Sequence, residues 1–112
     1  MKKIRICDLS QLTDPDSRGF ALSQDGGEVD GFAVHKDGLV SAFVNSCPHT
    51  GASLNWSPHQ FLDVEGEFIQ CSLHGAVFRV EDGFCVRGPC VGESLKSIPV
   101  VLEEGAIWVR FD

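Results

Sequence analysis

Short apolar segments alternate with polar turns along all 112 residues of the chain. The segments are rich in Val, Ile, Leu and Phe and are separated by Gly and Asp, which is typical of strands that bury one face. No stretch carries the sustained 3.6-residue spacing of an amphipathic helix. The pattern predicts an all-β fold, a sandwich of small antiparallel sheets.

Three hairpins are predicted where two strand-like segments are joined by a short turn that ends in glycine. They pair residues 28–35 with 39–44, 78–80 with 84–86, and 100–102 with 107–109. The turn of the first, Asp37-Gly38, is among the strongest local signals for a hairpin.

The strand pattern breaks down in two places, between Cys47 and Phe61 and from Cys71 to Ala76. Residues such as Pro, Gly, Ser, His and Asn favour loops there. No internal repeat or linker divides the chain, and its length suits one domain spanning residues 1–112.

The formal net charge is −7, from 9 basic and 16 acidic residues. Such a charge repels nucleic-acid phosphates and anionic lipids, so neither nucleic acid nor a membrane is an expected partner. No apolar run reaches the roughly 18–20 residues that span a bilayer. Arg5 and Asp8 also interrupt the apolar region that a signal peptide needs. These features indicate a cytoplasmic protein.

Two of the five cysteines fall in the two predicted loops, each followed by a histidine and a glycine. The motifs are Cys-Pro-His-Thr-Gly over residues 47–51 and Cys-Ser-Leu-His-Gly over residues 71–75. Thiolate and imidazole are ligands that iron and zinc accept, and two short loops can present them to one centre. Gly51 and Gly75 would let the backbone turn sharply beside the ligands and bring amide N–H groups toward bound sulfides.

This pair of motifs resembles the Rieske family, in which a C-x-H loop and a C-x-x-H loop hold one 2Fe-2S cluster. The resemblance spans about the whole chain and includes Gly88-Pro89, which falls where Rieske proteins carry a third loop over the cluster. It implies a Rieske-like sandwich with two cluster-binding loops. It also implies that Cys47 and Cys71 bind the inner iron and that His49 and His74 bind the outer one.

The same four residues, two cysteines and two histidines, could also form a closed structural zinc site. Zinc fingers usually present their cysteines together and their histidines together, whereas each loop here mixes one of each. The mixed order favours the cluster, whose two irons have different ligands. A red-brown colour on purification would eliminate zinc.

The spacer of 21 residues between His49 and Cys71, 50–70, is longer than is usual in Rieske proteins, and we assign the excess, 56–67, to an exposed insertion.

His35 and His59 have no neighbouring residues at the spacing of metal ligands, and we interpret them as a turn residue and a loop residue. The other cysteines, Cys7, Cys85 and Cys90, are expected to be buried. Of these, Cys90 follows the third loop's Gly88-Pro89 and could lie near the cluster.

High-potential Rieske proteins carry a disulfide between the loops and hydrogen-bond donors from a serine and a tyrosine. This chain has Ala52 and Leu73 at the disulfide positions and Ala76 at the serine position, and it contains no tyrosine. Each missing donor leaves the reduced cluster less stabilised, so a low potential is expected.

The resemblance implies a ferredoxin that carries single electrons between a reductase and a terminal oxidoreductase such as an oxygenase, and that is not itself an enzyme. The alternative is a redox small subunit of a larger reductase, similar to that of nitrite reductases. A zinc-stabilised interaction module is a third hypothesis. An oxygenase in its own right would need a second domain with a mononuclear iron, for which the 112 residues are too few.

Overall fold

The computed structural model describes residues 2–24, 27–48, 51, 53–55, 57, 59–72 and 75–111. Within them the chain forms one short 3-10 turn, Leu9–Gln11, and ten strands. The strands are β1 (Lys2–Asp8), β2 (Asp16–Gln24), β3 (Gly27–Lys36), β4 (Leu39–Val44), β5 (Ile69–Gln70), β6 (Val77–Phe78), β7 (Cys85–Arg87), β8 (Ser97–Ile98), β9 (Val100–Glu103) and β10 (Ala106–Phe111). The all-β prediction is confirmed, and no helix among the described residues is long and apolar enough to cross a membrane.

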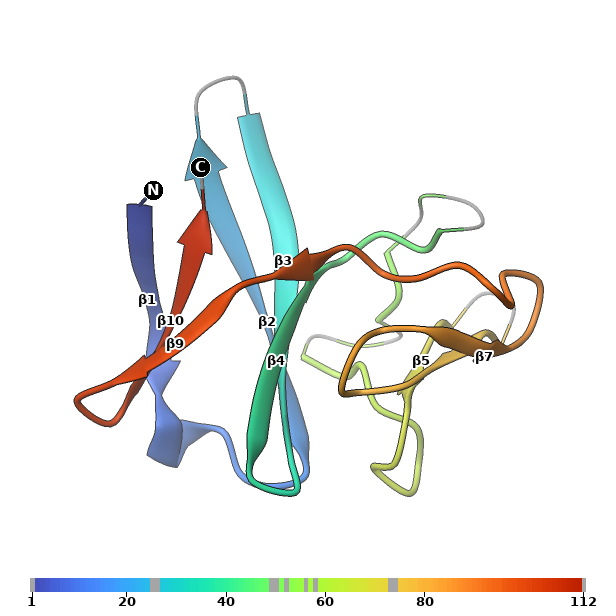
Figure 1. Cartoon of the computed structure of the whole chain (residues 1–112), viewed down its shortest axis with the longest axis horizontal. Coiled ribbons are helices and arrows are strands. Elements are labelled where there is room, and N and C mark those ends of the chain that lie inside the picture. Colours follow the sequence, from blue (N-terminus) through green and yellow to red (C-terminus); the bar gives the residue numbers. More distant parts are fainter. Residues whose placement is uncertain are drawn as a thin grey trace.

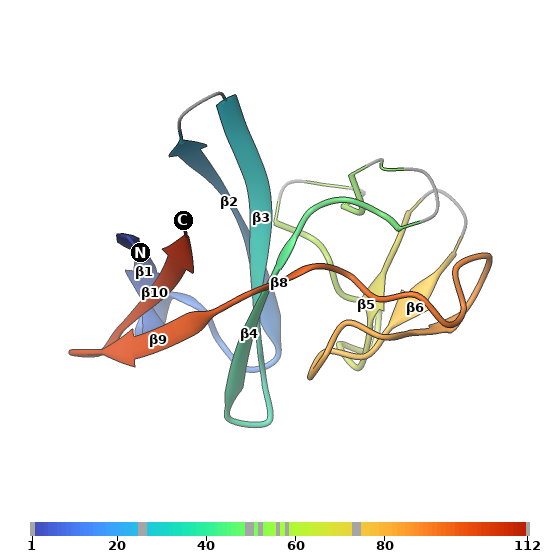
Figure 2. The same cartoon turned by 45° about the horizontal axis from the view of Figure 1, so that its top comes forward.

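The strands form three antiparallel sheets, in the orders β1-β10-β9, β2-β3-β4-β8 and β5-β6-β7. Figures 1 and 2 show the β2-β3-β4-β8 sheet in the middle, with the β1-β10-β9 sheet on one side and the small β5-β6-β7 sheet on the other. We call the β1-β10-β9 side the base and the β5-β6-β7 side, with its loops, the loop end. Both predicted motif loops belong to the loop end.

All three predicted hairpins are present, as β3–β4, β6–β7 and β9–β10. In the first, Asp37 and Gly38 both have positive φ angles, 52° and 81°, which is the type I′ geometry that suits the twist of a two-residue hairpin. In the second, the Arg79 N–H donates to the Phe84 carbonyl at 2.9 Å and closes the turn. Local turn chemistry therefore determined these pairings.

The middle sheet is buried on both faces. Residues 31–34 of β3 are all buried, although side chains alternate between the two faces of a strand. Ala33 belongs to a core cluster with Cys7 and Ile107 of the base, whereas Phe32 and Val34 belong to the core cluster of the loop end. The middle sheet thus separates two cores and contributes side chains to both.

Phe61 anchors the spacer between the two motifs on the middle sheet. Its ring stacks on that of Phe32 with centroids 4.2 Å apart and planes 8° from parallel, and its side chain is 2% exposed. The predicted exposed insertion over residues 56–67 is therefore wrong for Phe61. An aromatic residue within a polar segment does not indicate which distant side chain it packs on.

Ser17 of β2 fixes the backbone beside Phe61. Its hydroxyl donates to the His59 carbonyl at 2.7 Å and accepts from the Phe61 N–H at 3.0 Å. Ser17 is the one buried polar residue in the described part of the chain, and both hydrogen-bonding functions of its hydroxyl are used. The spacer is therefore attached to the middle sheet by polar contacts as well as by the aromatic stack.

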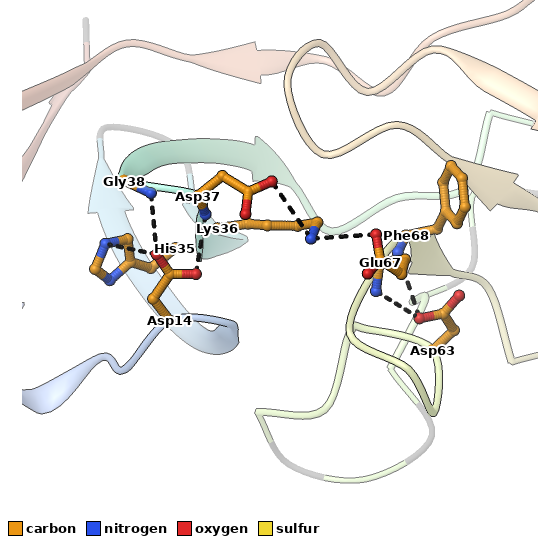
Figure 3. A network of polar contacts seen from close by, with 8 residues as sticks. All are labelled: Asp14, His35, Lys36, Asp37, Gly38, Asp63, Glu67 and Phe68. Atoms are coloured by element: carbon orange, nitrogen blue, oxygen red, sulfur yellow. Dashed lines mark hydrogen bonds and ion pairs between the residues drawn. The ribbon is translucent and has the colours of Figure 1, made fainter.

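A second polar connection, drawn in Figure 3, joins the end of β3 to the turn before β5. Lys36 Nζ lies 3.3 Å from a Glu67 carboxylate oxygen and 3.5 Å from an Asp37 oxygen, and the Lys36 side chain is 13% exposed. Asp63 accepts from the Glu67 N–H at 2.9 Å and so shapes the turn that presents Glu67. The Lys36–Glu67 ion pair thus bridges the middle sheet and the loop end.

Asp14 closes the β3–β4 turn from outside. Its carboxylate accepts hydrogen bonds from the Gly38 N–H at 3.0 Å and from the Asp37 N–H at 2.9 Å. These two bonds, the Gly38 bond first, lower the pKa of Asp14 below its ordinary value of 3.8. A lowered pKa means that this stabilisation is complete above the ordinary pKa and is lost as the pH falls through the lowered one.

We expect Asp14→Asn to make the stability of the protein depend less on pH at acid pH, because asparagine cannot gain a proton in this range. Asparagine also accepts hydrogen bonds with only one oxygen, so it replaces the two bonds of the carboxylate incompletely. Above pH 5 the variant should be less stable than the wild type, and the difference should shrink as the pH falls below 4. Thermal unfolding followed by circular dichroism from pH 3 to pH 7 measures this. The control is Asp30→Asn, an exposed carboxylate of β3 with no side-chain hydrogen bond or ion pair within the described residues. A constant Asp14→Asn deficit at every pH would contradict the assignment.

Candidate metal centre

Cys47 and Cys71, the two predicted thiolate ligands, lie in the same group of buried core side chains at the loop end. Cys47 follows β4 and Cys71 follows β5, and the two side chains are 2% and 0% exposed. The structure therefore brings the two predicted cysteines from separate loops into one apolar environment. The two predicted histidine ligands, His49 and His74, lie outside the described residues.

The two motif loops make the same turn. The Gly51 N–H donates to the Cys47 carbonyl at 2.7 Å, and the Gly75 N–H donates to the Cys71 carbonyl at 3.2 Å. Both glycines have positive φ angles, 77° and 68°, which residues with a side chain rarely adopt. The expected sharp turns are confirmed, and the N–H group of each glycine closes its turn on the cysteine carbonyl.

Hydrogen bonds connect the second loop to the segment that follows the first. The Ser72 N–H donates to the Leu54 carbonyl at 2.9 Å, and the Leu54 N–H donates to the Asn45 side-chain oxygen at 2.7 Å. The Asn45 amide group in turn donates to Asn55 at 3.0 Å. Sequence reasoning missed Asn45 because its partners lie nine and ten residues away in an irregular segment, where no periodicity predicts contacts.

The third loop lies against the residue that follows the second motif. A Cβ placed on Gly88 would lie 2.7 Å from the Ala76 Cα, and Gly88 has a φ of 103°. Ala76, directly after the second motif, is fully buried. Only glycine lets the backbone of the third loop approach Ala76 this closely.

Three further cysteines are buried, as predicted. Cys7 belongs to the base, whereas Cys85 and Cys90 belong to the same cluster as Cys47 and Cys71. The Cys90 thiol donates to the Cys85 sulfur at 3.2 Å, and the Cys85 thiol donates to the Arg87 carbonyl at 3.2 Å.

Two of the buried thiols outside the motifs, those of Cys7 and Cys90, resist ionisation. Burial, followed by the Cys85 and Cys47 side chains, raises the pKa of Cys90 from 9.0 to about 12. Burial likewise raises the pKa of Cys7, against the opposing effect of Arg18 and Arg5. Such thiols behave as neutral hydrogen-bonding groups at neutral pH rather than as nucleophiles.

His35 and His59 have structural contacts. A His35 ring nitrogen lies 2.8 Å from the Leu12 carbonyl oxygen, and His59 Nδ1 accepts from the Gly19 N–H at 3.0 Å. His35 lies within β3, so its interpretation as a turn residue is wrong, whereas His59 lies in a loop as expected. Neither histidine joins the cysteine cluster.

The donor set fits an iron–sulfur centre. Two buried thiols reach one environment from loops of matching geometry, and thiolates are the ligands that iron–sulfur clusters use. Among the described residues no group of three or more His, Cys, Asp and Glu side chains is arranged to hold a metal ion.

The chain belongs to the Rieske [2Fe-2S] domain family, whose model matches residues 2–101. One 2Fe-2S cluster is the cofactor that this membership implies. The fold and the paired cysteine loops agree with that class.

Solved structures of Rieske ferredoxins have the same fold. The ferredoxin of carbazole 1,9a-dioxygenase from Nocardioides aromaticivorans IC177 is 28% identical, with 97% of each chain covered and a TM-score of 0.73. The ferredoxin of Sphingomonas yanoikuyae B1 is 25% identical, with 99% of this chain and 100% of that chain covered and a TM-score of 0.71. A structure of a reduced oxygenase in complex with an oxidised ferredoxin, from carbazole 1,9a-dioxygenase, contains a chain with 23% identity over 96% of this chain and 91% of that one. Its TM-score of 0.74 shows a shared fold.

We expect Gly88→Ala to lower the thermal midpoint and speed the loss of the 2Fe-2S cluster more than Gly92→Ala does. Both glycines lie in the third loop with similar φ angles of 103° and 95°. Alanine at either position adds backbone strain of about 1–3 kcal/mol. Only at position 88 does the new methyl group also clash with Ala76, since nothing lies within 4 Å of a Cβ at position 92. Thermal midpoints and the rate of visible bleaching at fixed temperature measure the two effects. Equal losses in the two variants would show that the close packing on Ala76 is unimportant.

Proposed function

We propose that Cys47, His49, Cys71 and His74 hold the 2Fe-2S cluster, with both cysteines on one iron and both histidines on the other. The burial of the two cysteines in one hydrophobic core and the matching turns of their loops support this assignment. The membership of the chain in the Rieske family supplies the histidine half, because that family uses two imidazoles on one iron.

The function that fits best is that of a ferredoxin, which takes single electrons from a reductase and delivers them to a terminal oxygenase. One observation carries this proposal: the match to a dioxygenase ferredoxin covers 97% of both chains at 28% identity. In this role the protein has no substrate site of its own and acts in the cytoplasm.

The bound cluster supplies one-electron chemistry, and the chain controls access to it. The buried cysteine side of the site excludes water, since Cys47 and Cys71 are covered by the core of the loop end. We propose that electrons leave on the histidine side. The exposed Val86 of β7 and Val91 of the third loop, at 43% and 60%, offer apolar contacts for a protein partner.

The ligand assignment predicts two different outcomes for two kinds of substitution. Cys47→Ala or Cys71→Ala should abolish the cluster and much of the folded stability. His49→Cys or His74→Cys should retain two irons and two sulfides per chain, as 2Fe-2S centres with four thiolates do, at a lower potential. Iron and acid-labile sulfide analysis with a redox titration measures this. An unchanged spectrum and potential in both His→Cys variants, or zinc without sulfide in the wild type, would contradict the assignment.

The carrier proposal predicts that Val91→Asp slows electron delivery without changing the midpoint potential. Loss of a central contact residue typically costs more than 1 kcal/mol of binding, which corresponds to about a five- to tenfold fall in the second-order rate at low protein concentration. Stopped-flow oxidation of the reduced protein by the oxygenase of a carbazole 1,9a-dioxygenase measures the rate. The control is Leu102→Asp, a residue of similar exposure, 51%, on β9 of the base. Failure of the wild type, with its cluster intact, to reduce the oxygenase would argue against this function.

A further inference from the structure

The Cys90 thiol lies where it can act on a proposed cluster ligand. It is 1% exposed and belongs to the same buried cluster as Cys47. The Cys47 side chain is also among the groups that raise the pKa of Cys90, after burial and the Cys85 side chain. The third loop thus places a neutral S–H group beside the first predicted ligand.

Backbone hydrogen bonds hold Cys90 in this position. The Glu93 N–H donates to the Cys90 carbonyl at 2.9 Å, and the Cys85 N–H donates to the Glu93 carbonyl at 2.8 Å. The third loop is therefore attached to β7 on one side of Cys90. On the other side, Gly88 is packed against Ala76. Because the loop backbone is held on both sides of Cys90, the Cys90 side chain keeps a defined direction.

Two sulfur acceptors compete for the Cys90 proton. One is the Cys85 sulfur at 3.2 Å, whose own thiol donates to the Arg87 carbonyl. The other is Cys47, which as an iron ligand is a thiolate. Hydrogen bonds to an ionised acceptor are roughly twice as strong as those to a neutral one, so the Cys90 proton should turn from Cys85 to Cys47 when the cluster is present.

We propose that Cys90 donates an S–H hydrogen bond to the Cys47 sulfur and thereby raises the reduction potential of the cluster. The inference rests on the proposed ligand role of Cys47. An added electron increases the negative charge on the cluster and its thiolates, and a donor to a ligand sulfur therefore stabilises the reduced form more than the oxidised form. Cys90 is a positioning and tuning residue in this scheme, not a ligand.

The sequence gives this donor particular weight. Ala76 has no hydroxyl, and the chain contains no tyrosine, so neither of the side-chain donors expected in high-potential relatives is present. Thiols are weak donors. The effect of Cys90 should therefore be smaller than that of a hydroxyl in the same place.

Two other roles for Cys90 would produce different results. Cys90 could simply fill space, in which case only its volume matters. It could also form a disulfide with Cys85, since the two sulfurs are 3.2 Å apart, well beyond the roughly 2.05 Å of an S–S bond but close enough for one to form after a small movement. A disulfide would remove the proton on which the proposal depends.

The test compares the midpoint potentials of the cluster-loaded wild type, Cys90→Ala and Cys90→Ser. Alanine removes the donor, and serine restores one of similar size and greater strength. At the wild-type midpoint, the ratio of oxidised to reduced Cys90→Ala should rise roughly three- to tenfold, whereas Cys90→Ser should be as reduced as the wild type or more so. Equal potentials in all three proteins, or equal shifts in both variants, would overturn the proposal.

Cys7 provides the matched control, because it is also a buried cysteine, at 2% exposure, but belongs to the base. Cys7→Ala and Cys7→Ser should leave the potential unchanged. A readout without any substitution is the resonance Raman spectrum in heavy water. Deuteration of the Cys90 thiol should shift an iron–thiolate stretching band in the wild type, and the same shift should be absent from Cys90→Ala. An equal heavy-water shift in both proteins would count against the bond.

Two further measurements separate the failure of this inference from failure of the proposed ligand set. Retention of the cluster by Cys47→Ala would overturn both, since Cys47 would not be a ligand. Cluster loss in Cys47→Ala together with an unchanged Cys90→Ala potential would overturn the Cys90 proposal alone. Thiol titration of the denatured, iron-free protein should find all five cysteines reduced. Only three titratable thiols in the wild type, together with all three remaining thiols titrating in a Cys85→Ala, Cys90→Ala double variant, would establish the disulfide and overturn the hydrogen bond.

Discussion

Burial of the middle sheet on both faces is the constraint on which the rest of the structure depends. Strands β5 and β6 have two residues each, and a sheet this small is not stable without a surface to pack on. Phe32 and Phe43 of the middle sheet provide that surface, with ring centroids 5.7 Å apart. The other face of the same sheet packs on the base through small side chains such as Ala33 and Ala42. The two motif loops therefore rest on a sheet that the base stabilises from its opposite face.

The polar contacts between the layers reinforce this arrangement at two places. Ser17 attaches the spacer near Phe61, and Lys36 binds Glu67 in the turn before β5. Burial by itself would lower the pKa of Lys36, but the Glu67 and Asp37 carboxylates outweigh that effect and raise it, so the lysine remains charged at neutral pH. Exposed ion pairs contribute little on their own. The Ser17 and Lys36 contacts instead fix the orientation of the loop end relative to the middle sheet.

The sequence predicted the features that local chemistry determines. The hairpin turns at Asp37-Gly38 and Glu104-Gly105 and the sharp turns at Gly51 and Gly75 each depend on a few adjacent residues. The burial of Phe61 and the hydrogen bonds of Asn45 depend on partners far along the chain or in irregular segments, and no period of two or 3.6 encodes them. Cys90 and Cys47 belong to one buried group of side chains although they are 43 positions apart. The position of Cys90 after Gly88-Pro89 suggested that it could lie near the 2Fe-2S cluster, but its hydrogen bond to Cys85 could be found only in the three-dimensional structure.

The first and last strands pair with each other, Lys2 opposite Phe111, in the base. Figure 1 shows the two chain ends together on the side of the molecule away from the third loop and the β5-β7 sheet. A short tether at either chain end would therefore attach the protein to an electrode or a bead through its base. The loop end would face the solution, so that immobilised molecules share one orientation for electron exchange with a dissolved partner.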